Sequence, residues 1–132
     1  MTQEDKELLL KDLCARLPYE VKCEAIYWRN RNKGIWDLKR NKICINFSNI
    51  SILNRDDIDV RPYLFPLSSM TDEQKIEYHE LIHELNIKAI EGEISNVDCS
   101  VAEVDWLNAH HFDYRGLIEK GLAIDATGLN IY

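Results

Sequence analysis

The sequence lacks the features of secreted, membrane-spanning and zinc-knuckle proteins. Cys14, Cys23, Cys44 and Cys99 stand far apart with no CxxC pair, which argues against a disulfide framework or a zinc knuckle. No run approaches the roughly 20 apolar residues that cross a bilayer. The first ten residues, MTQEDKELLL, lack the basic and apolar regions of a secretory leader. We therefore expect a cytoplasmic protein with reduced thiols and no membrane association.

Several catalytic motifs are missing as well. The chain contains no glycine-rich phosphate loop, no GxSxG elbow, and no cysteine within a nucleophile motif. It also has no repeats, no low-complexity tract and no linker. At 132 residues, with 45% hydrophobic and 30% charged residues, it is long enough to bury a core. We expect residues 1–132 to form a single domain.

The net charge of −7 is divided unevenly along the chain. Residues 1–66 hold 12 Lys/Arg and 10 Asp/Glu, whereas residues 67–132 hold 4 and 13. The acidic second half would repel nucleic acid and anionic membranes at long range. The charge split also suits a protein partner with a complementary pattern.

One basic stretch, residues 28–42, interrupts this acidic character. Tryptophan rings stack on bases and arginines hold phosphates, so the stretch is a candidate site for a nucleotide-like anion or nucleic acid. Solvated hairpin tips carry the same residue types for solubility, and we favour that interpretation. The candidate ligand-binding residues are Trp28, Arg29, Arg31, Trp36 and Arg40.

Hydrophobic periodicity predicts an N-terminal helix followed by short strands. Thr2 and Asp5 can cap a helix whose leucines recur at i, i+3 and i+4 until Pro18 ends it. Connections of three to five residues are too short for parallel crossovers, so we expect an antiparallel β-meander of about four to five short strands. The predicted strands are Val21–Trp28, Ile35–Leu38, Lys42–Phe47, Ile50–Leu53 and a further one at Ile58 and Val60.

The clearest helix signal lies at residues 71–90. Thr71 and Gln74 form a capping box, and Gly92 is a plausible stop. Two apolar strips predict two neighbours for this helix, and its glutamates gather on a solvated face. The first strip contains Tyr78, Leu81, Ile82, Leu85 and Ala89, and the second contains Ile76, Ile87 and Ile90 together with two histidines.

The remainder of the chain completes an α+β fold. Glu93–Ser100 is predicted to be a polar connector, and Val101–His111 has the spacing of a second helix. Phe112–Tyr132 is punctuated by glycines and is predicted to be an irregular tail on the core. His110 and His111, with polar neighbours at residues 113–115, are expected to attach this tail rather than to catalyse.

The segment His79-Glu80-Leu81-Ile82-His83 matches the HExxH signature of zinc peptidases. On a helix, His79 and His83 project from one face and can bind Zn²⁺, while Glu80 can activate the metal-bound water. A catalytic zinc needs a third protein ligand, for which Glu103 is the candidate, with Asp105, His110 and His111 as further possibilities. No glycine-marked extension follows the motif, and isoleucines share the strip with the histidines. We therefore keep a zinc-dependent hydrolase as the alternative function.

Three longer strings carry a resemblance to a known group of proteins. They are KDLCARLPY (Lys11–Tyr19), PYLFPLSSMTDEQ (Pro62–Gln74) and DWLNAHHFDYRGLIEKGLAIDATG (Asp105–Gly128). In these strings, roughly half of the chain, the sequence resembles small proteins encoded by phages, prophages and mobile elements of gut Bacteroidetes. The resemblance implies a genomic context and no chemistry. It omits residues 75–104, so it assigns no role to the histidine pair.

Taken together, the sequence favours a small cytoplasmic binding protein without enzymatic activity or cofactor. The resemblance suggests that its partner is a host or defence protein. The alternatives are a zinc-dependent HExxH hydrolase using His79, Glu80 and His83, and a binder of a nucleotide-like anion or nucleic acid through the basic stretch.

Overall fold

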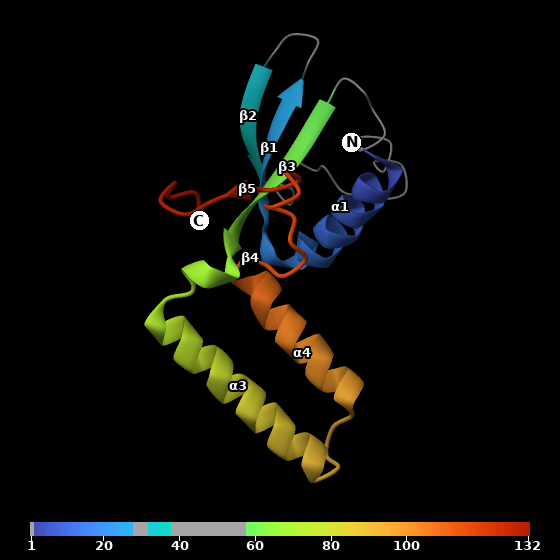
Figure 1. The fold of residues 1–132 in the computed structure, drawn as a ribbon, viewed down its shortest axis with the longest axis vertical. Helices are drawn as coiled ribbons and strands as arrows, with labels where there is room; N and C mark the ends of the chain where they lie inside the picture. Colours follow the sequence, from blue (N-terminus) through green and yellow to red (C-terminus); the bar gives the residue numbers. More distant parts are fainter. Residues whose placement is uncertain (1, 28–31, 38–57) are drawn as a thin grey trace.

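The computed structural model describes residues 2–27, 32–37 and 58–132 (Figure 1). Its elements confirm the predicted α+β class. Among the described residues, no helix is long and apolar enough to cross a membrane. In chain order the elements are α1 (Gln3–Arg16), η1 (Leu17–Tyr19), β1 (Lys22–Tyr27), β2 (Asn32–Asp37), β3 (Ile58–Pro66), η2 (Leu67–Ser69), α3 (Asp72–Ile90), α4 (Asn96–Ala109), β4 (Phe112–Asp113) and β5 (Ile124–Asp125).

The sheet has the strand order β2-β1-β3-β4, and β5 also pairs with β3. The pairs β1–β2 and β1–β3 are antiparallel, as the sequence predicts. The two tail strands run parallel to β3, with Phe112 beside Phe65 and Ile124 beside Tyr63. The sheet is therefore mixed, and the tail is less irregular than predicted because its backbone hydrogen-bonds to β3. The strands predicted at Lys42–Phe47 and Ile50–Leu53 lie outside the described residues.

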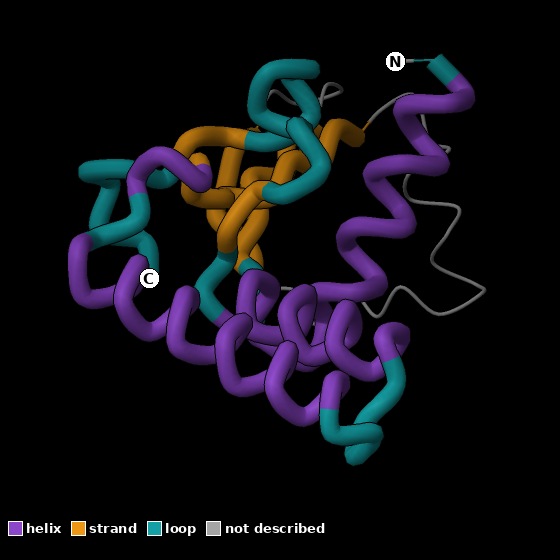
Figure 2. The backbone as a smooth tube through the Cα atoms, turned by 60° about the horizontal axis from the view of Figure 1, so that its bottom comes forward, coloured by secondary structure: helices purple, strands orange, loops and turns teal. Residues whose placement is uncertain are grey.

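Helix α1 lies beside the sheet (Figure 2), and the hydrophobic core combines residues of α1, the sheet and the tail. Thr2 caps α1 by accepting a hydrogen bond from the Asp5 amide at 3.1 Å. The helix gives way to η1 at Pro18, which cannot continue an α-helical hydrogen-bond ladder. The buried residues of this core are Leu9, Leu13, Val21, Cys23, Val60, Leu64, Leu117, Leu122 and Ala123.

Helices α3 and α4 form a hairpin that extends away from the sheet and α1 (Figure 1). The predicted capping box is confirmed, since Thr71 and Gln74 bond reciprocally at the start of α3. Gly92 follows the helix with φ +76°, a conformation that suits glycine. Helix α4 begins five residues earlier than predicted, because Ser95 caps it by accepting a hydrogen bond from the Asp98 amide at 3.1 Å.

Candidate functional site

The inner faces of α3 and α4 are held together by three hydrogen bonds. The Tyr78 hydroxyl donates to Glu103, and the Trp106 indole donates to the Glu77 carboxylate at 3.0 Å. The Cys99 thiol donates to a backbone oxygen of α3 at 3.5 Å. The centroids of the Tyr78 and Trp106 rings lie 5.2 Å apart. Burial and the bond to Glu103 raise the pKa of Tyr78 to about 12, so the hydroxyl keeps its proton.

The predicted core-facing strip of α3 is only half-buried. The side of α3 that carries this strip faces α4, but in the described part of the chain none of the 19 residues of α3 is buried. The five residues of the strip, all half-buried, are Tyr78, Leu81, Ile82, Leu85 and Ala89. The opposite face is open to solvent: Ile76, Ile87 and Ile90 are 60%, 42% and 86% exposed. The second neighbour predicted for this face is therefore not supplied by the residues that the structure describes.

The hairpin is strongly acidic. Residues 72–109 hold ten Asp/Glu and two lysines. Lys88 forms an ion pair with Glu84 at 3.2 Å, but the two side chains are 43% and 65% exposed, so the pair contributes little stability. The outer face of α3 consequently combines apolar side chains with a negative field.

The HExxH residues lie on this outer face. His79, Glu80 and His83 are all exposed. Glu103 does not join them, because it belongs to α4 and its carboxylate accepts the hydrogen bond from Tyr78 on the inner side of the hairpin. Within the described chain, no group of three or more His, Cys, Asp or Glu side chains is placed to hold a metal ion.

The downstream histidines are used in packing. The His110 ring stacks on Trp106 at 4.1 Å, and its Nδ1 lies 2.9 Å from the Trp106 carbonyl oxygen. The His111 ring stacks on Tyr132 at 3.7 Å. Burial, reinforced by the positive charge of Arg16, lowers the pKa of His111 to about 4. Neutral His111 is thus part of the tail's attachment, as the sequence predicts.

A buried ionic cluster, not predicted from the sequence, ties α1 to the tail. Arg16 donates from Nε to Asp12 and from Nη2 to the Phe112 carbonyl, both at 2.7 Å. Arg115 lies 3.2 Å from Asp12 without hydrogen-bond geometry, so that contact is electrostatic. The Tyr114 ring lies about equally far from the two guanidinium groups, at 5.2 and 5.1 Å. The available signal was an oppositely charged i, i+4 pair beside the buried leucines of α1.

The basic stretch contributes little to the described structure. Trp28, Arg29, Arg31 and Arg40 lie outside the described residues, and Trp36 belongs to β2.

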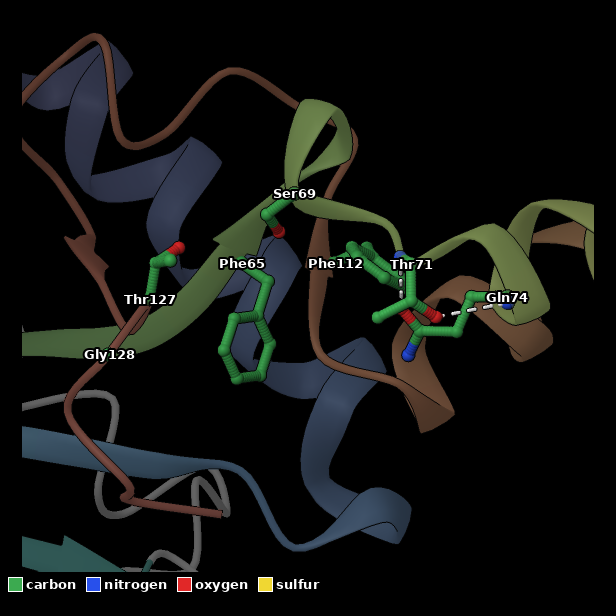
Figure 3. Close-up of a pocket in the computed structure, with 7 residues that line it drawn as sticks. All are labelled: Phe65, Ser69, Thr71, Gln74, Phe112, Thr127 and Gly128. Atoms are coloured by element: carbon green, nitrogen blue, oxygen red, sulfur yellow. Dashed lines mark hydrogen bonds between the residues drawn. The ribbon is translucent and has the colours of Figure 1, made fainter.

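A cleft of about 250 Å³ lies where the hairpin joins the sheet (Figure 3). Three of its polar side chains are engaged locally: Ser69 donates to the Pro66 carbonyl at 2.7 Å, while Thr71 and Gln74 cap each other. No charged side chain lines it, so it suits an apolar group better than an ion. The lining residues are Phe65, Ser69, Thr71, Gln74, Phe112, Thr127 and Gly128.

Comparison with protein-family models, curated proteins and solved structures gives no match to this chain.

Proposed function

We propose that this protein acts by binding another protein, without catalysis, and that the outer face of α3 is its contact surface. The observation that supports this function is the apolar strip of Ile76, Ile87 and Ile90, exposed on a hairpin that extends from the core. Complete burial of an isoleucine side chain is favourable by about 1.5–3 kcal/mol. A partner that covers all three therefore gains substantial binding free energy.

The acidic field around the strip favours a protein over nucleic acid or an anionic membrane, both of which it repels. The mobile-element context implied by the sequence resemblance favours a host or defence protein of the cytoplasm as that partner.

Site-specific photo-crosslinking tests the proposal. A photoreactive amino acid replaces Ile87 in one variant and Val101 in a control variant. Both positions are apolar and similarly exposed, at 42% and 52%. They differ in that Ile87 belongs to α3 and Val101 to α4. We expect a discrete covalent adduct with another protein from position 87, formed in cells that naturally carry the gene.

The absence of an adduct at position 87 would contradict the proposed function. Equal adduct patterns at both positions would also contradict it, because they would indicate nonspecific collision. Circular dichroism of the two variants verifies that both remain folded.

A further inference from the structure

The outer face of α3 has the residue spacing of a coiled-coil seam. Ile76, Glu80, His83, Ile87 and Ile90 are separated by four, three, four and three residues, and all five are exposed. This alternation keeps the side chains on one stripe and defines a and d positions of a heptad, with d at residues 76, 83 and 90. The seam lies opposite the side of α3 that packs on α4, because Tyr78 is two residues, about 200°, beyond Ile76. Glu77, which lies between the two sides, accepts the hydrogen bond from Trp106 of α4. A second helix can therefore pack along it without disturbing the hairpin.

The residues beside the seam determine which helix fits. The e position, directly after each d position, determines partner choice through charge. This position is glutamate after each of the three d residues, twice within α3 and once at the residue that caps its C-terminal end, and all three are exposed. These residues are Glu77, Glu84 and Glu91.

A second copy of α3 does not fit this seam. In an antiparallel pair, e positions face e positions, so the two rows of glutamates would lie opposite each other. In a parallel, in-register pair, Glu80 of one copy would face Glu80 of the other within the seam. Like charges brought together across an interface are strongly unfavourable. The charge pattern therefore selects a different chain.

We propose that the helix bound by α3 is an amphipathic, basic segment of another protein, with apolar residues at its a and d positions and Lys or Arg beside them. A Lys or Arg that flanks the partner's apolar positions can reach Glu80 and neutralise the one carboxylate within the seam. The inference rests on the proposed function, which it deepens by specifying the partner's chemistry. The hairpin has a net excess of eight acidic residues, and this negative charge is complementary to a basic partner helix.

Two synthetic peptides of three heptads provide the direct test. Both carry leucine at a and d, but one has lysine and the other glutamate at e and g. Binding of each labelled peptide to the full chain is measured by fluorescence anisotropy at low and moderate salt. We expect the lysine peptide to bind at least about tenfold more tightly than the glutamate peptide, a difference of about 1.4 kcal/mol. Added salt reduces this preference, because it screens exposed charges.

Two variants connect binding to the seam. Ile87→Asp places a charge in the apolar strip and is expected to weaken the lysine peptide at least about tenfold. The matched change Val101→Asp on α4 is expected to leave binding unchanged. Glu84→Lys combined with Glu91→Lys is expected to shift the preference towards the glutamate peptide.

Three results would overturn the inference: equal binding of the two peptides, no binding of the lysine peptide, or loss of binding in Val101→Asp alone. Sedimentation equilibrium showing a dimer that Ile87→Asp dissociates would identify a second copy as the occupant and would likewise overturn it. If position 87 still cross-links to another protein while the peptides fail, the proposed function survives and only the basic helix is refuted.

Discussion

Replacing Asp12 with asparagine tests the buried ionic cluster directly. Asp12 and Arg16 are both fully buried and 2.7 Å apart, and Arg115 approaches the same carboxylate at 3.2 Å. Asn keeps the size of the side chain but removes its charge. Two guanidinium groups then share a site without the carboxylate that compensates them.

The expected cost is about 3–5 kcal/mol, because breaking a buried ion pair leaves an uncompensated buried charge. This is a large part of the 5–15 kcal/mol that stabilises a typical domain. Urea unfolding followed by circular dichroism measures it as a lower midpoint with an unchanged slope. Combining Asp12→Asn with Arg16→Met should cost clearly less than the sum of the single changes, because the two residues act as a pair.

Glu7→Gln is the matched control, since Glu7 is exposed on the same helix. We expect it to change the free energy of unfolding by no more than about 0.5 kcal/mol. A loss below about 1 kcal/mol for Asp12→Asn would refute the reasoning, because it would mean that the cluster remains solvated.

Three further predictions concern titration and metal binding. Burial lowers the pKa of His111 to about 4 from an ordinary 6.5. Between pH 6.5 and pH 4 the unfolded chain therefore binds a proton at His111 that the folded chain does not, so the free energy of unfolding is fully retained above pH 6.5 and decreases as the pH falls towards 4. Urea midpoints measured across this range should depend less on pH in His111→Asn. Glu103→Gln should bring the pKa of Tyr78 from about 12 towards 10.0, because it removes the negative charge of Glu103 that disfavours the tyrosinate; tyrosinate absorbance measures this pKa. Zinc should leave the melting temperature unchanged, because the described residues provide no third ligand beside His79 and His83; a zinc-dependent rise abolished by His83→Ala would instead support the hydrolase.

The elements predicted correctly from the sequence are those determined by nearby residues. The reciprocal bonds of Thr71 and Gln74 act within one turn, and Pro18 ends α1 through its own missing amide proton. The early start of α4 was missed although Ser95 and Asp98 formed a readable cap. There, a local signal was present and was outweighed by the polar composition of the segment.

The elements that were missed depend on distant parts of the chain. Residues 112 and 113 pair with β3 because the hairpin returns the chain to it, which no local pattern specifies. For the candidate site, the sequence predicted the exposed glutamates and separated two strips of α3. It did not predict that the strip at Ile76, Ile87 and Ile90 would remain exposed in the described structure. Its heptad spacing was nevertheless readable from the sequence.

The parallel pairing of the tail with β3 has a consequence for biosynthesis. The Phe65 amide bonds to the His111 carbonyl and the Ala126 amide to the Leu64 carbonyl, both at 2.8 Å, while Leu117 lies fully within the core. A nascent chain that has emerged only as far as α4 therefore leaves these backbone groups of β3 without their tail partners and lacks the tail residues of the core that α1 packs against. Unpaired strand edges and exposed apolar surface are the features that make partly folded chains aggregate. Translation must thus pass residue 126 before the molecule can protect its own interior.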